Sequence, residues 1–264
     1  MFRTVSSSRS SRVLITSAVL LLAATVAHAA PTPEQQCLAR RTSAHSKYEQ
    51  CVGKWLAKFY AGEVNPDEFT AYAAALAKLA KCRIKYARTW SRLQGLGTTC
   101  AAASRYTDNG DGTVTDNLTG LVWEKKSDNG DIHDKDSFGT WAAGASLNGT
   151  GTAFTTFVRE GLNAGAGFAG ANDWRLPTFV ELQTIMLPES YPCSTSPCID
   201  AAFNTSCAAG CVATACSCTS VFYWSATTLG SLPSAAWGVN FTDGYVYYNY
   251  KFLNDSVRAV RGGL

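Results

Sequence analysis

Ten cysteines constrain this chain more than any other feature of its sequence. Cysteines in such number are typical of proteins that fold in an oxidising compartment and are cross-linked there by disulfides. They fall into two groups, each with an even number of members, so we expect two separately cross-linked regions. The first group is Cys37, Cys51, Cys82 and Cys100, and the second is Cys193, Cys198, Cys207, Cys211, Cys216 and Cys218.

The amino terminus carries an export signal that agrees with such a compartment. Arginines at the start precede a mostly apolar run from Val13 to Ala27, and the small residues of AHAA follow. This order is typical of a secretory signal peptide, and the apolar run is too short for a membrane span. We therefore expect residues 1–30 to be a signal peptide and the mature protein to be exported to the periplasm or the cell exterior.

Residues 31–100 predict a disulfide-stapled antiparallel helical hairpin. The segment is rich in Ala, Lys, Leu and Arg, and its one clear break is the stretch GEVNPDEF, where a glycine ends one helix and a proline begins the next. Cysteines at similar distances on either side of this break are expected to pair, as Cys51–Cys82 and Cys37–Cys100. A four-cysteine zinc site is the alternative, but the wide spacings lack the paired short loops of zinc motifs.

The charge of the mature chain is unevenly distributed. Residues 31–100 carry 11 basic and 5 acidic side chains, whereas residues 101–264 carry 9 basic and 15 acidic side chains. We interpret the basic excess of the first region as a lysine-rich solvated helix face, with a partner-binding segment as the alternative. The mature chain has no net charge, and we expect no nucleic-acid partner.

Residues 101–264 predict an α+β domain with a largely antiparallel sheet. The turn signals NGDG and NLTG separate three short strand candidates, and FYWSATT, AAWGVNFT and SVRAVRGG are strand-like near the end. Short helices are expected over Phe154–Asn163 and Thr178–Leu187. The second has a clear start, because Thr178 and Glu181 have the spacing of a capping box.

Residues that could carry catalysis are few. After the leader the chain has two histidines, His45 and His133, and neither lies near a recognisable nucleophile signature. The sequence contains neither a phosphate-binding glycine loop nor a paired-histidine metal motif. It therefore favours binding over catalysis and predicts no cofactor, although two carboxylates brought together by the fold would be an alternative.

The acidic stretch SDNGDIHDKDS is a candidate metal site. Its four carboxylates repel one another unless they are solvated or bind a cation. We interpret the stretch as an exposed acidic loop, with a calcium site as the alternative. The candidate ligands are Asp128, Asp131, Asp134 and Asp136.

Five motifs in the second region resemble a known bacterial domain. In order, they are YTDNGDGTVTDNLTGLVWEKK, NDWRLPTFVEL, YWSATT, AWGVNFTDGYVYY and VRAVR. Residues 104–263 thereby resemble the C-terminal domain of the Legionella collagen-like adhesin. This resemblance implies a C-type-lectin-like fold with two short helices and a mainly antiparallel sheet.

The same resemblance implies adhesion, because the namesake of the family binds sulfated glycosaminoglycans as a trimer. This chain shows no Gly-X-Y stalk, and its second region is net acidic, which argues against a sulfated polyanion as ligand. We therefore expect an exported module that binds a glycan or a protein at the bacterial surface, with a homo-oligomer left open. The alternatives are a hydrolytic or oxidative enzyme on the same fold and a purely structural envelope protein.

The run DGYVYYNYKFLN is expected to carry the ligand site. Asp243 and Gly244 predict a two-residue hairpin turn, which would place Val239 opposite Tyr248. Because side chains alternate along a strand, one face of this hairpin is expected to be core and the other polar. The expected core face is Trp237, Val239, Phe241, Val246, Tyr248, Tyr250 and Phe252. The polar face supplies the candidate ligand-binding residues Asn240, Thr242, Tyr245, Tyr247, Asn249 and Lys251, with an inert solvent face as the alternative.

Overall fold

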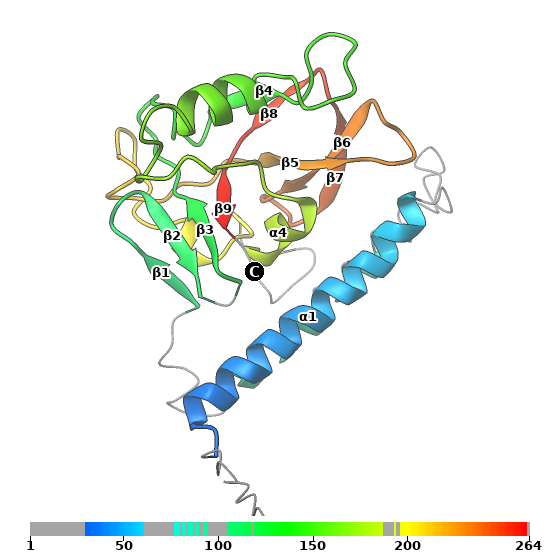
Figure 1. The fold of residues 1–264 in the computed structure, drawn as a ribbon, viewed down its shortest axis with the longest axis vertical. Coiled ribbons are helices and arrows are strands. Elements are labelled where there is room, and N and C mark those ends of the chain that lie inside the picture. The colour runs from blue at the N-terminus through cyan, green and yellow to red at the C-terminus, as the bar shows by residue number, and fades with distance from the viewer. Residues whose placement is uncertain are drawn as a thin grey trace, which may run out of the picture. The chain divides into compact units, whose positions relative to one another are not determined.

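The structure is a computed structural model, shown in Figure 1. It describes residues 30–60, 77–79, 81–82, 84–86, 88–89, 92–93, 95, 105–117, 119–186, 193 and 196–262. The expected signal peptide and the expected boundary between residues 100 and 101 lie outside these residues, so both stay predictions. Among the described helices, none combines the length and the apolar character that a membrane crossing requires.

The first region is a pair of antiparallel helices, as predicted. Helix α1 spans Pro33–Tyr60, and the described residues between 77 and 93 are helical. The predicted disulfide Cys51–Cys82 is confirmed, with its Cα atoms 5.8 Å apart. Tyr48 and Tyr86 pack beside it, with ring centroids 5.0 Å apart. Because Tyr48 precedes Cys51 while Tyr86 follows Cys82, the two helices run in opposite directions. The expected partner of Cys37, Cys100, lies outside the described residues.

The second region is α+β, with strand pairs that are mainly antiparallel, as predicted. One sheet has the order β1-β2-β3-β9, and the other has the order β4-β8-β5-β6-β7, with β5 and β8 parallel. The strands of the first sheet are β1 (Tyr106–Asp108), β2 (Thr113–Asp116), β3 (Leu121–Glu124) and β9 (Val260–Gly262). The strands of the second are β4 (Phe138–Thr140), β8 (Asn254–Ser256), β5 (Phe222–Thr228), β6 (Ala235–Asn240) and β7 (Val246–Tyr250).

Both expected helices of this region are present. The first is η1 (Ala153–Leu162), whose hydrogen bonds follow the wider π-helical pattern. The second is α4 (Phe179–Thr184), and its predicted capping box between Thr178 and Glu181 is confirmed. A single 3₁₀ turn, η2 (Ala201–Phe203), follows later in the chain.

The five-stranded sheet is covered on both faces. Trp237 and Val239 of β6 pack into one core cluster with Phe179 of α4. Trp224 of β5 and Ala236 of β6 pack into a second cluster that includes the buried side chains of η1. The face of β6 and β7 that was expected to be polar and open to solvent is therefore buried over most of the sheet. Helix η1 and the loops around β4 cover it.

The six late cysteines form three disulfides. They are Cys193–Cys198, Cys207–Cys218 and Cys211–Cys216. Two of these bonds cross-link the loop that precedes β5, a stretch with little regular structure of its own. Small or irregular regions with little buried surface commonly depend on such cross-links.

Gly238→Ala is expected to destabilise the five-stranded sheet by about 1–3 kcal/mol. A Cβ on Gly238 would overlap the Phe222 ring and lie 2.7 Å from the carbonyl oxygen of Tyr223, a backbone atom that cannot move aside. Gly53→Ala is the matched control, because a Cβ there meets nothing within 4 Å on an exposed helix surface. That control is expected to stabilise α1 by about 0.5–1 kcal/mol. Urea unfolding of both variants measures the difference, and equal effects would contradict the close approach at Gly238.

Candidate functional site

The β6–β7 hairpin forms the end of the sheet where the sequence placed the ligand site. Its register pairs Val239 with Val246 and Trp237 with Tyr248, so the predicted register is wrong by two residues. The turn is a four-residue loop, in which the N–H of Gly244 donates to the carbonyl oxygen of Asn240 at 2.9 Å. A shift of two residues leaves every side chain on its predicted face.

Two features explain the longer loop. The side-chain oxygens of Asn240 and Asp243 accept the N–H groups of Thr242 and Tyr245 at 2.7 and 2.8 Å, which stabilises successive turns of the backbone. The N–H of Phe241 donates to the carbonyl of Val221 rather than to β7. Phe241 is fully buried, so the core holds this residue away from the hairpin ladder.

A pair of tyrosines stands beside this loop. The rings of Tyr245 and Tyr247 are 5.8 Å apart and tilted by 35°, and Tyr247 is 38% exposed. Next to them, Thr242 is exposed in the loop, and Asn240, the last residue of β6, is half-buried. Burial and the neighbouring Asp243 carboxylate both raise the pKa of Tyr247. We call Asn240, Thr242, Tyr245 and Tyr247 the tyrosine platform.

Lys251 does not belong to this platform, and its expected place on an open face is wrong. Its side chain is buried, its Nζ donates to the carbonyl of Leu147 at 2.6 Å and to Oγ1 of Thr228 at 2.8 Å, and it lies 3.8 Å from the Trp141 ring centroid. Asn249 is half-buried, and its amide donates to Asp255 at 2.9 Å. The physical reason is that the face carrying both residues is covered by the second core cluster.

The far end of β7 also differs from the predicted pattern. Tyr250 and Phe252 were expected in the core, but they are 44% and 61% exposed. Their rings stack 5.7 Å apart with an interplanar angle of 19°. β7 is the outermost strand of its sheet, Tyr250 is its last residue, and Phe252 lies in the turn that follows.

A buried ionic network surrounds Glu124, the last residue of β3, and the sequence did not predict it. Oε1 of Glu124 is 3.1 Å from Nζ of Lys126 and 2.9 Å from Nδ1 of His133, and Oε2 accepts the N–H of Ala259 at 2.8 Å. Burial by itself would raise the pKa of Glu124, but the Lys126 ammonium, the hydrogen bond with His133 and the N–H of Ala259 lower it. The only signal in the sequence is the charged triplet that ends LVWEKK, which also fits an exposed strand end.

Arg258 is also fully buried and carries a charge. Its Nη2 donates to the carbonyl of Cys218 and to Oγ1 of Thr219. The guanidinium lies between the rings of Phe203 and Tyr223, 5.4 and 5.2 Å from their centroids. These contacts attach the disulfide-rich loop to the segment between β8 and β9, which indicates a structural role.

The acidic stretch does not bring its four carboxylates together. Asp128, Asp134 and Asp136 lie within reach of one another, but Nζ of Lys135 is 3.1 Å from Asp128 and 2.5 Å from Asp136. Asp131 instead accepts hydrogen bonds from Ser127, Asn129 and the N–H of His133. Lys135 therefore offsets one of the three negative charges of this group, and the calcium alternative stays a prediction.

Comparison with known families identifies the second region. A family model described as the Lcl C-terminal domain matches residues 112–261, more than half of the chain. This match confirms the resemblance that the five motifs predicted. No curated protein matches the chain, and no solved structure does either.

Proposed function

The chain belongs to the Lcl C-terminal domain family, and from that premise we propose that it is an exported module that binds a glycan at the bacterial surface or in the envelope. The observation that carries this proposal is the tyrosine platform. It combines two aromatic rings that solvent reaches with polar groups on the β6–β7 loop and the strand ends beside it. The C-type-lectin-like fold is part of the proposal, and the short helices and mainly antiparallel sheets support it.

A sugar ring needs the two kinds of contact that the platform offers. The C–H groups on one face of a pyranose pack against an aromatic ring, whose face carries negative charge. Its hydroxyls need donors and acceptors at fixed positions, as in most small-molecule sites. The hydroxyls of Thr242 and Tyr247 and the amide of Asn240 are such groups.

Binding rather than hydrolysis or oxidation is proposed because three carboxylates of this region pair with cations. Asp116 is held by Arg105 at 2.8 Å, and Glu181 is held by Arg175 at 2.7 Å. Glu124 is held by Lys126, as described above. The two half-buried acids whose pKa burial raises, Asp200 and Asp255, accept hydrogen bonds from the N–H of Ala202 and the amide of Asn249 instead. A glycosidase needs an acid and a base that are free to exchange protons with the substrate. The disulfides support export, and the lysine in the acidic stretch supports binding without calcium.

The double variant Tyr245→Ala with Tyr247→Ala is expected to weaken glycan binding about tenfold or more, because aromatic anchors carry much of the binding energy of a site. The matched control is Tyr250→Ala with Phe252→Ala, which removes two exposed aromatic rings from the other end of β7. That control is expected to change affinity by less than about twofold. A glycan array identifies the ligand, and titration calorimetry of the three proteins measures the affinities.

Circular dichroism establishes that both double variants are folded before they are compared. If both double variants lose the same affinity, or only the control loses affinity, the glycan does not bind at the tyrosine platform. If folded wild-type protein binds no glycan but an extended peptide pairs with the edge of β7, the partner is a protein strand. If the protein turns over a substrate and one Asp or Glu substitution abolishes that turnover, the enzyme alternative replaces binding.

A further inference from the structure

The helical hairpin carries a heptad pattern. Side chains at the seam between its helices recur at alternating intervals of three and four residues, which is the spacing of positions a and d in a coiled coil. Most of them are buried, and the Tyr48–Tyr86 and Cys51–Cys82 contacts lie on this seam. The seam residues are Cys37, Arg41, Ala44, Tyr48, Cys51 and Trp55 on α1, and Leu79, Cys82, Tyr86, Thr89 and Leu93 on the second helix.

Cations repeat every seven residues beside this seam, at position g of both helices. In an antiparallel pair, the g positions of the two helices flank the same side of the seam. All six residues are exposed, and no side chain among them forms a hydrogen bond or an ion pair with another described residue. These two cation rows are Arg40, Lys47 and Lys54 on α1, and Lys78, Lys85 and Arg92 on the second helix.

The described hairpin offers no counter-charge to these rows. Its acidic residues are Glu34, at the start of α1, and Glu49. Glu49 is 3.3 Å from Nε2 of His45, one helical turn earlier. Rows of like charge beside one seam destabilise the pair of helices by repulsion. An external anionic group would relieve that repulsion.

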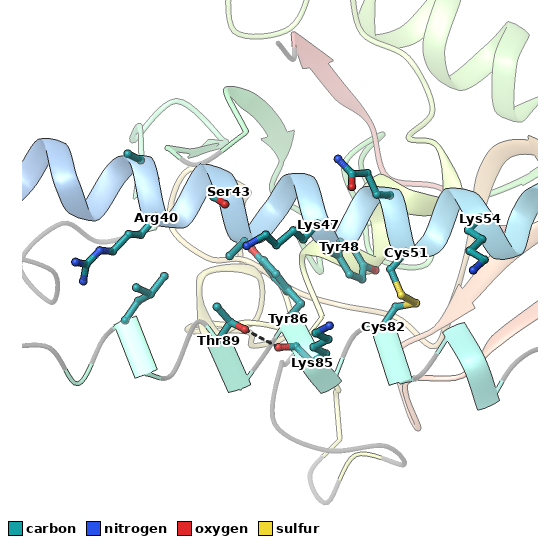
Figure 2. Close-up of a pocket in the computed structure, with 14 residues that line it drawn as sticks. Arg40, Ser43, Lys47, Tyr48, Cys51, Lys54, Cys82, Lys85, Tyr86 and Thr89 are labelled. Carbon is teal, nitrogen blue, oxygen red and sulfur yellow. Dashed lines mark hydrogen bonds between the residues drawn. A yellow bond between two sulfur atoms is a disulfide. The ribbon is translucent and has the colours of Figure 1, made fainter.

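Between the rows lies a groove of about 940 Å³, shown in Figure 2. Arg40, Lys47 and Lys54 border it along α1, and Lys85 borders it on the facing helix. Its floor is formed by apolar and aromatic side chains of the seam together with the disulfide. The floor residues include Ala44, Tyr48, Cys51, Cys82, Tyr86 and Leu93.

We propose that this groove docks a third α-helix, supplied by a partner protein, with an apolar ridge and acidic residues at seven-residue intervals. The groove between two packed helices is where the third helix of a bundle lies. Successive cations in a row are separated by about 10.5 Å of helix rise, and a partner helix with acids every seventh residue matches that repeat. From Arg40 to Lys54 the row is about 21 Å long, or about four turns.

A synthetic helix of about three heptads tests the proposal, with Leu at positions a and d and Glu at positions e and g. It is labelled and titrated with the full mature chain, and fluorescence anisotropy measures the affinity. Lys47→Gln with Lys85→Gln is expected to weaken binding about tenfold, because two ion pairs are lost beside the groove. Lys81→Gln with Arg88→Gln removes the same charge from exposed sites that do not border the groove, and is expected to change affinity by less than about twofold.

A charge reversal provides the second measurement. Lys47→Glu with Lys85→Glu is expected to prefer a peptide with Lys in place of Glu at e and g, because opposite charges at these positions select the partner. Equal losses in the two glutamine pairs, or no reversal of preference, would overturn the proposal. Anionic phosphatidylglycerol vesicles that bind while the peptide does not would also overturn it, in favour of a membrane surface. The proposal is independent of glycan binding, so either one can fail alone.

Discussion

Glu124→Gln is expected to lower the free energy of unfolding by about 3–5 kcal/mol, the largest effect of any single substitution considered for this chain. The carboxylate is fully buried and accepts from Lys126, His133 and the backbone N–H of Ala259. An amide in its place cannot compensate the Lys126 ammonium, which is also fully buried. Removing one partner leaves an uncompensated charge in a medium of low dielectric constant.

Urea unfolding followed by tryptophan fluorescence measures this loss. The control is the double variant Glu124→Gln with Lys126→Met, which removes the ammonium as well. Because buried ion pairs can often be replaced by apolar groups at little cost, the double variant is expected to recover most of the stability. If the double variant is less stable than the single one, the network does not act as a compensated pair and the expectation is wrong.

The same carboxylate predicts a dependence of stability on pH. The lowered pKa of Glu124 in the fold means that its ionised form stabilises the native state. That contribution is present above the unfolded value, about 4.3, and is lost as the pH falls through the folded value. The wild type has the larger free energy of unfolding at neutral pH, and its difference from Glu124→Gln is expected to shrink as the pH falls below about 4. A difference in the free energy of unfolding that stays constant from neutral to acidic pH would contradict a lowered pKa of Glu124 in the fold.

Local signals in the sequence predicted the parts of the fold that depend on local physics. The capping box at Thr178 acts within one helical turn. The pairing of Cys51 with Cys82 was predicted from their similar distances to the break expected in GEVNPDEF, which lies outside the described residues. The alternation along β6 and β7 was also read correctly, because the period of two is a property of any strand. These signals were sufficient for the α+β class and for the helical hairpin.

The errors at the candidate site come from packing between distant segments. Phe241 is drawn into the core and bonded to Val221, and this contact lengthens the turn. Lys251 is buried against Trp141, which lies more than a hundred residues earlier in the chain. Glu124 contacts His133 and the backbone N–H of Ala259 only once the sheet has formed. No periodicity within one strand contains such information.

Removing the disulfide of the hairpin, by Cys51→Ala with Cys82→Ala, is expected to cost about 4 kcal/mol. The bond closes a loop across a sequence separation of 31, and the entropy that it removes from the unfolded chain grows with loop length. Cys211→Ala with Cys216→Ala is the matched control, because that bond closes a separation of 5 and is expected to cost about 2 kcal/mol.

Thermal unfolding followed by the helical circular dichroism signal compares the two disulfide variants, since the hairpin contributes most of the helix. The hairpin variant is also expected to lose affinity for the acidic helix, because the bond holds the floor of the groove between Tyr48 and Tyr86 together. The control variant leaves that floor intact and is expected to bind as the wild type does. If both variants unfold at the wild-type temperature, the helices are held by packing alone, and the cross-link does not stabilise the hairpin.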